Sequence, residues 1–283
     1  MSGKLIKLKS KIKATTKTKK ITKALQLISA SKMKSFQDKA ISSRKFEEEL
    51  NKLAVENYDL DFENTYTENR TSGKILFILY TSDKGFCGPM NSKLITTLTK
   101  SELWEKTIPQ EKLLITFGKK GYDFARNNKV SVIKNYQEIS ENISIPELVS
   151  IIDEILLLWD QEQIKELHMV APHFKNTFVY YPKIEQFLPL NFLNDENNNP
   201  NTIFEPSSQE FLDSIFLKII FAKFFRNFME LKATEYSSRM IAMQNSTDSA
   251  SEIIKSLTLK YNKNRQEAIT NEIAEILGNK FNE

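Results

Sequence analysis

Residues 233–261 read ATEYSSRMIAMQNSTDSASEIIKSLTLKY and carry a regular seam of small, apolar and aromatic side chains. Alternating steps of three and four residues pick out Ala233, Tyr236, Met240, Met243, Thr247, Ala250, Ile254, Leu257 and Tyr261. A repeat sustained over about four heptads predicts a coiled-coil helix. Because several seam residues are small, the partner helix is expected to approach closely.

Glycine and proline divide the chain into three parts. Of the 7 glycines and 8 prolines, 13 lie between Gly73 and Pro206, so residues 4–72 and 207–277 contain neither. Tracts of this length without helix breakers predict long helices. We therefore expect an N-terminal coiled-coil helix over residues 1–60, a central domain over 73–206 and a C-terminal coiled-coil helix over 207–283. The two terminal helices are expected to pair antiparallel.

The two helical tracts differ in their apolar pattern. In the first tract the apolar and small residues are less regularly spaced: Ile21, Leu25, Ile28, Ser29, Met33, Phe36, Ala40, Phe46, Leu50 and Leu53. In the second tract, Phe211 to Met229 is apolar on most faces. A helix that is apolar nearly all round is buried, so this segment is expected to pack against the central domain.

The central part alternates strand-like and helix-like segments. The expected strands are 74–80, 113–117, 130–133, 167–171 and 178–188, and the expected helices are 90–103, 119–127 and 146–159. Such alternation predicts an α/β domain of Rossmann-like type with a mainly parallel sheet. The expected fold class is α/β, with a long antiparallel coiled coil of the terminal helices.

The net charge of +4 is unevenly distributed. Residues 1–39 carry twelve lysines and one acidic residue, Asp38, which leaves the rest of the chain negative. This asymmetry fits an acidic partner surface, a nucleic acid, membrane headgroups or a solvated helix face. A lysine-rich coiled-coil protein that binds nucleic acid is therefore one open alternative.

Other kinds of chemistry have little support in the residues. No run approaches 18 consecutive apolar residues, which excludes a transmembrane helix, and the single cysteine, Cys87, excludes an internal disulfide. Residues 81–91 contain two glycines but neither a complete phosphate-binding loop nor a dinucleotide fingerprint. We expect no metal, cofactor or catalytic residue, although a thiol enzyme that pairs Cys87 with His168 or His173 remains a further alternative.

Three segments together resemble the gamma subunit of F-type ATP synthases. They are residues 11–33 (KIKATTKTKKITKALQLISASKM), residues 81–91 (TSDKGFCGPMN) and the C-terminal run with EYSSRMIAM at 235–243 and YNKNRQEAITNEI at 261–273. Their order and spacing cover essentially the whole chain. The resemblance implies a non-catalytic rotor shaft, with the terminal helices inside a ring of alpha and beta subunits. It implies that the central domain contacts the epsilon subunit and the membrane ring of c subunits.

The resemblance also implies contact residues. Arg265, Gln266 and Thr270 match a polar cluster that contacts a loop of the beta subunit in this family, and Lys20 and Lys23 lie in a matching N-terminal segment. The implied partners do not include nucleic acid, and no part of the chain is expected to insert into a membrane. The signature begins almost at Met1, so a peripheral location on the cytoplasmic face of a bacterial inner membrane is expected.

Overall fold

The computed structural model describes residues 3–57, 64–139, 143–161, 163–192, 205 and 207–280. The chain forms two compact units, one of Met1–Ala30 with Arg239–Glu283 and the other of Ser31–Ser238. Two long helices contribute to both units: α1 (Gly3–Asn57, 55 residues) and α6 (Ser208–Lys280, 73 residues). The boundaries expected at residues 60 and 206 lie outside the described residues.

The start of α6 is set by a local sequence pattern. The Ser207 hydroxyl oxygen accepts a hydrogen bond from the backbone N–H of Glu210 at 3.2 Å. A serine followed three residues later by glutamate is the capping-box pattern, which satisfies N–H groups that the first helical turn leaves unpaired. The absence of breakers before Gly278 then allows the helix to continue.

In the unit of Met1–Ala30 with Arg239–Glu283, α1 and α6 run antiparallel. The hydroxyl oxygens of Thr22 and Thr247 lie 2.8 Å apart, and Gln26 Nε2 donates to Gln244 Oε1 at 3.2 Å. Residue numbers rise along α1 as they fall along α6, which confirms the expected antiparallel pairing.

The seam on α1 is regular, contrary to the expectation from its apolar residues. Ile21 and Ile28 are 61% and 54% exposed, whereas the neighbouring Thr22 and Ser29 are buried. Within this unit, one series of buried and half-buried positions again follows steps of three and four: Leu5, Leu8, Ile12, Thr15, Lys19, Thr22, Gln26 and Ser29. The repeat was hidden because polar and small side chains occupy much of it.

The unit Ser31–Ser238 contains a five-stranded sheet in the order β3-β2-β1-β4-β5. The strands are β1 (Lys74–Tyr80), β2 (Lys112–Phe117), β3 (Val132–Tyr136), β4 (Ile164–Asn176) and β5 (Val179–Leu188). The first four are mutually parallel and β5 is antiparallel to β4. The sheet is therefore mainly parallel, and the α/β fold class is confirmed.

Besides parts of α1 and α6, the described helices of this unit are α2 (Met90–Thr99), α3 (Glu102–Lys106), a single 3₁₀ turn (Pro109–Glu111), α4 (Lys119–Asn127) and α5 (Ile145–Gln161). The expected single helix over 90–103 was wrong, because Ser101 caps a second helix by accepting from the Trp104 N–H at 3.2 Å. The third strand begins later than expected. The Val130 N–H first bonds the carbonyl of Ala125 and closes the end of α4.

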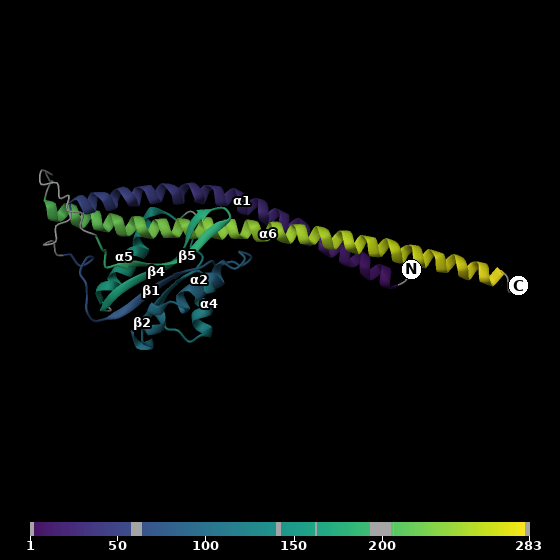
Figure 1. The fold of residues 1–283 in the computed structure, drawn as a ribbon, viewed down its shortest axis with the longest axis horizontal. Helices are drawn as coiled ribbons and strands as arrows, with labels where there is room; N and C mark the ends of the chain where they lie inside the picture. The colour runs from purple at the N-terminus through teal and green to yellow at the C-terminus, as the bar shows by residue number, and fades with distance from the viewer. Residues whose placement is uncertain are drawn as a thin grey trace. The chain divides into compact units, whose positions relative to one another are not determined.

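The two faces of the sheet pack against different helices (Figure 1). On one face, Phe224 of α6 makes edge contacts with the rings of Tyr80 and Phe117. On the other face, the side chain of Leu79 lies beside Gly121 of α4. Because successive strand residues point to opposite faces, these contacts put α6 and α4 on opposite sides. The expected packing of the phenylalanine-rich segment against the central domain is thus confirmed.

Candidate functional site

The nine seam residues of α6 fall in both units. Ala233 and Tyr236 are buried in the unit Ser31–Ser238, where the Tyr236 ring stacks on Phe36 of α1 with centroids 5.6 Å apart. In the other unit Met243, Thr247 and Ala250 are buried. The remaining seam residues are half-buried: Met240, Ile254, Leu257 and Tyr261.

Arg265, Gln266 and Thr270 are exposed on α6. The Thr270 hydroxyl donates to the Gln266 carbonyl at 2.9 Å, so its proton is used within the helix. Gln266 and Thr270 are four residues apart and therefore lie on one face. The guanidinium of Arg265 and the amide of Gln266 are the groups best able to contact a partner.

Lys20 and Lys23 are exposed on α1. Lys23 Nζ donates to Gln26 Oε1 at 3.2 Å, and Gln26 in turn donates to Gln244 of α6. This chain of side chains links Lys23 to the facing helix. The hydrogen bonds given by the structure join neither lysine to Arg265, Gln266 or Thr270.

Exposed apolar side chains also mark this unit, and the sequence analysis missed them. Among the residues of this unit whose exposure the structure describes, eight large hydrophobic ones are at least two-fifths exposed: Ile6, Ile21, Leu27 and Ile28 on α1, and Ile253, Leu259, Ile269 and Ile273 on α6. Exposed apolar residues that gather into one patch mark a surface that a partner covers, whereas singly scattered ones are ordinary. These residues lie outside the three-and-four repeat of the two seams, and that was the feature of the sequence that could have indicated their exposure.

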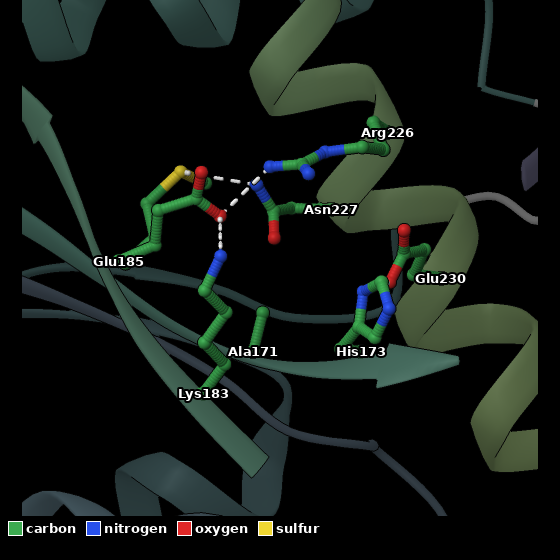
Figure 2. Close-up of a pocket in the computed structure, with 8 residues that line it drawn as sticks. Ala171, His173, Lys183, Glu185, Arg226, Asn227 and Glu230 are labelled. Carbon is green, nitrogen blue, oxygen red and sulfur yellow. Dashed lines mark hydrogen bonds and ion pairs between the residues drawn. The ribbon is translucent and has the colours of Figure 1, made fainter. Parts of the chain in front are cut away.

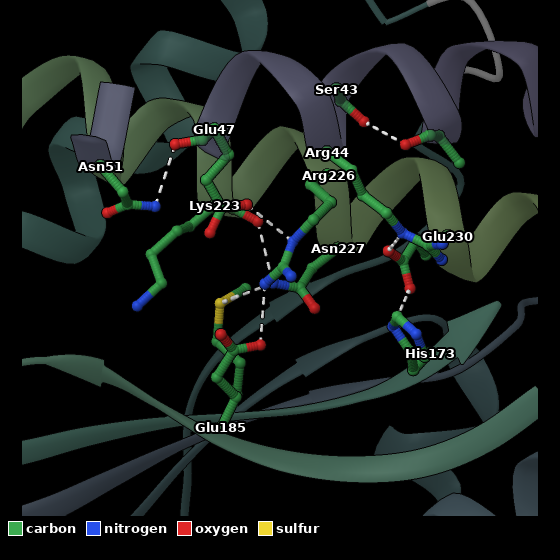
Figure 3. Close-up of polar contacts among 12 residues, drawn as sticks. Ser43, Arg44, Glu47, Asn51, His173, Glu185, Lys223, Arg226, Asn227 and Glu230 are labelled. Atoms are coloured by element: carbon green, nitrogen blue, oxygen red, sulfur yellow. Dashed lines mark hydrogen bonds and ion pairs between the residues drawn. The ribbon is translucent and has the colours of Figure 1, made fainter. Parts of the chain in front are cut away.

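A second group of polar residues lies in the unit Ser31–Ser238. It consists of Arg44 and Glu47 on α1, Glu185 on β5, and Arg226 and Glu230 on α6, and we call it the charged cluster (Figure 3). Arg226 lies 2.8 Å from both Glu47 Oε2 and Glu185 Oε2, through Nε and Nη2 respectively. Arg44 Nε donates to Glu230 Oε1 at 2.7 Å.

Glu230 is the most enclosed member of the charged cluster, with a side chain only 2% exposed. Its second oxygen accepts from the backbone N–H of Phe174 at 2.9 Å and lies 3.1 Å from His173 Nδ1. Arg44 also donates to the Phe174 carbonyl. The carboxylate of one α6 residue is thereby tied to both α1 and β4.

Burial and neighbouring charges act against each other in this cluster. Burial raises the pKa of the Glu47 carboxyl, with Arg226 partly opposing it. Burial acts to raise the pKa of Glu185 too, but Arg226, Lys223 and Lys183 outweigh it and hold that pKa below its ordinary value. Burial lowers the pKa of Lys223. The strong effect of burial follows from the low exposure of these side chains, 8% for Glu47 and 13% for Arg226.

A small cavity of about 10 Å³ opens beside the charged cluster, lined in part by His173, Lys183 and Glu185 (Figure 2). Such a volume holds about one water molecule. It is too small for a nucleotide or a metabolite.

Comparison with known proteins gives a consistent result. The family model described as "ATP synthase" matches residues 4–279. The "ATP synthase gamma chain" of Buchnera aphidicola subsp. Acyrthosiphon pisum (strain Tuc7) is 33% identical over 277 residues, covering 95% of each chain. The chain belongs to the ATP synthase gamma chain family.

Solved structures share the fold of this gamma chain. The rotor of Euglena gracilis mitochondrial ATP synthase in rotational state 1 matches with a TM-score of 0.65 and 14% identity, covering 94% of this chain and 99% of that one. The central stalk and c-ring structure of Tetrahymena thermophila mitochondrial ATP synthase matches with a TM-score of 0.61 and 22% identity, covering 80% and 98%. At these identities the comparison concerns the fold alone.

The loop at residues 81–91 shows how this gamma chain fills the edge of the sheet where α/β proteins often bind phosphate. The Asp83 carboxylate accepts from the backbone N–H groups of Lys119 at 3.0 Å and Glu138 at 3.2 Å. The Gly121 N–H bonds the Thr81 hydroxyl oxygen at 2.8 Å. Backbone donors at the start of α4 are therefore occupied by side chains of the gamma chain itself.

The side chains proposed for a thiol enzyme have other partners in this gamma chain. Cys87 is buried, and its sulfur accepts from Asn91 Nδ2 at 3.2 Å. His168 Nε2 lies 2.8 Å from Glu166 Oε2, and His173 contacts Glu230. The recorded contacts of Cys87 thus involve neither histidine.

Among the described residues, no helix is both long and apolar enough to cross a membrane.

Proposed function

We propose that this chain is the central-stalk rotor subunit of a proton-driven ATP synthase. In this role it couples rotation of the membrane ring to conformational changes at the catalytic sites of the beta subunits. The observation that carries the proposal is family membership over nearly the whole chain, together with an antiparallel pair of long helices. The chain itself is non-catalytic in this proposal, because nucleotide chemistry belongs to the beta subunits.

The surface of the helix pair suits a shaft that contacts different partners in turn. A rotor biases three equivalent sites differently only if its faces differ, because a ligand shifts populations only through differential contacts. The described faces combine lysines such as Lys20 and Lys23 with exposed apolar residues such as Ile28 and Leu259. We infer that Arg265, Gln266 and Thr270 contact a beta-subunit loop.

The partners follow from the same proposal. The helices meet the alpha and beta subunits, and the sheet-bearing part, within 73–206, meets the epsilon subunit and the ring of c subunits. The protein acts as a peripheral component on the cytoplasmic face of a bacterial inner membrane. The nucleic-acid alternative has no support from the relatives named above, which are ATP synthase gamma chains and central stalks.

Reconstitution with alpha and beta subunits from the same source tests this function. We expect one stable complex whose ATPase rate is well above that of alpha and beta alone. The double variant Arg265→Ala/Gln266→Ala should weaken association by about tenfold or more, because it removes two polar contacts. Lys255→Ala, at another exposed position of α6, serves as the control and should behave like the wild type.

One outcome would count against the rotor role, and another only against the proposed contact residues. Folded wild-type chain that neither joins the complex nor raises its ATPase rate would exclude a conventional rotor role. Association that is unchanged in the double variant would leave the rotor role standing but exclude Arg265 and Gln266 as important contacts.

A further inference from the structure

The charged cluster connects four elements, α1, α6, β4 and β5, at two successive levels of α6. Arg226 joins α6 to α1 through Glu47 and to β5 through Glu185. One turn later, Glu230 joins α6 to α1 through Arg44 and to β4 through the Phe174 N–H. Each level therefore ties both long helices to the β4–β5 hairpin (Figure 3).

Net stability does not account for so many enclosed charges. Replacing a buried ion pair with apolar residues of similar volume is often neutral or stabilising. The surrounding contacts are apolar and extensive, as the buried rings of Phe224 and Phe228 on the same helix show. Apolar contacts, however, have no preferred direction, whereas the charge-assisted hydrogen bonds from Arg44 to Glu230 and from Arg226 to Glu185 require particular distances and angles. The contact between Arg226 and Glu47 is an ion pair without hydrogen-bond geometry, and it depends on the sign of the two charges.

The order of charges on the two helices selects one register. Arg44 faces Glu230 and Glu47 faces Arg226, so the signs alternate along both α1 and α6. A slip of α6 by one turn, about 5.4 Å, would bring Arg226 opposite Arg44 in one direction. In the other direction it would bring Glu230 opposite Glu47. Either slip replaces attraction by repulsion between enclosed like charges.

We propose that the charged cluster is the joint that holds α1 and α6 in register against the β4–β5 hairpin under load, so that torque passes from the sheet into both helices without slip. This inference rests on the rotor function proposed above. Both helices continue from this unit into the paired segments of the other. Arg44, Glu47, Glu185, Arg226 and Glu230 are positioning residues and act on catalysis only through the helices.

The test separates mechanical coupling from stability. The double variant Glu47→Met/Arg226→Met removes one complete pair and leaves Glu185 with Lys183, whose Nζ lies 3.5 Å from Glu185 Oε2. The matched control Glu49→Met/Lys52→Met removes an exposed pair from the same helix, with N and O 2.7 Å apart. Each variant is assembled into the complete complex in membrane vesicles. Proton pumping per ATP hydrolysed and the unfolding midpoint of the isolated chain are measured.

We expect Glu47→Met/Arg226→Met to keep the wild-type unfolding midpoint or exceed it, and to hydrolyse ATP, but to lose pumping per ATP hydrolysed. The control Glu49→Met/Lys52→Met should pump as many protons per ATP hydrolysed as the wild type. A stable Glu47→Met/Arg226→Met variant that pumps as many protons per ATP hydrolysed as the wild type would overturn the proposal. If the double variant does not fold, Arg226→Lys replaces it, because lysine keeps the charge but cannot span both carboxylates.

If Arg226→Lys pumps fewer protons per ATP hydrolysed than the wild type, the proposed role of the charged cluster is supported. If it pumps as many, the proposal is overturned. Failure of the rotor function itself would look different. The wild-type chain and the Glu49→Met/Lys52→Met control would then also fail to couple hydrolysis to pumping.

Discussion

Gly118 lies between β2 and α4 with a φ of 84°, a conformation that residues with a side chain rarely adopt. A Cβ atom at this position would lie 2.3 Å from the backbone oxygen of Thr81. The backbone of Thr81 is itself fixed, because its N–H donates to the Phe117 carbonyl at 2.8 Å. The clash therefore cannot be relieved by turning a side chain.

We expect Gly118→Ala to lower the free energy of unfolding by about 2–4 kcal/mol, because it combines backbone strain with a steric clash. Gly85→Ala is the control, since a Cβ there would have nothing within 4 Å, and should change stability by less than about 0.5 kcal/mol. Urea unfolding of both variants measures the difference. Equal stability of the two variants would contradict the described geometry.

His173 connects pH to stability at the edge of the charged cluster. Burial lowers the pKa of its imidazole below 6.5, with Glu230 opposing this effect and Arg44, Arg226 and Lys183 adding to it. The folded protein therefore binds fewer protons at this site than the unfolded chain. Its contribution to stability is complete above pH 6.5 and is lost as pH falls through the lowered pKa.

We expect His173→Gln to lose less stability than the wild type between about pH 7.5 and about pH 5.5, because the glutamine does not titrate. Denaturant midpoints at both pH values measure the effect. Glu185 should not contribute in this range, because its pKa is held below 4.5 and its stabilising effect is lost only below that pH. A variant with the full wild-type loss would show that His173 is not the titrating group.

The contacts of individual residues could not be predicted from sequence as well as the elements could. Glu47, Glu185 and Arg226 are far apart along the chain, and only the fold brings their charges together. Arg226 did interrupt an otherwise apolar segment, which was the available signal. A charge inside a buried helix segment needs a partner, but the sequence does not say which one.

At the scale of elements, the two seams differ in how well the sequence predicts them. The α6 seam carries apolar and aromatic residues such as Met243 and Tyr261, so its repeat is visible in the sequence. The α1 seam includes Thr22 and Ser29, which are buried because of what faces them across the helix pair. Burial of a small polar residue depends on the partner helix, which hydrophobic periodicity within one helix cannot reveal.

The Thr22–Thr247 contact leads to a prediction about the helix pair. Each hydroxyl also has a backbone acceptor, the Lys19 carbonyl at 3.1 Å for Thr22 and the Met243 carbonyl at 2.8 Å for Thr247, and either hydroxyl can be the donor between the helices. Either single change to valine removes the bond between the helices and leaves the other hydroxyl only its backbone partner, which should cost about 0.5–1.5 kcal/mol. The double variant Thr22→Val/Thr247→Val should be close to the wild type, because both polar groups are removed together.

A double-mutant cycle on helical circular dichroism during denaturation measures this coupling. Thr18→Val on the exposed face of α1 is the control, since its hydroxyl bonds only the carbonyl of Ala14 among the recorded partners. Strictly additive effects of the two seam changes would show that the hydroxyls do not interact.

At the scale of the whole chain, the antiparallel pairing followed from the distribution of breakers and one heptad repeat, and the α/β class followed from the alternation of strand-like and helix-like segments. The family followed from three short segments whose order spans the sequence, and the match over residues 4–279 agrees with it. The proposed contacts of Arg265, Gln266, Thr270, Lys20 and Lys23 stay predictions. They depend on partner surfaces, and no property of this chain alone determines those surfaces.

Direct observation of rotation tests the central claim most sharply. A head of alpha and beta subunits is fixed to a surface, a marker is attached to the sheet-bearing part of this chain, and ATP is added. The account predicts that the marker turns in one direction in steps that follow ATP hydrolysis. A head that hydrolyses ATP with this chain bound while the marker stays still, or moves without direction, would contradict the rotor function.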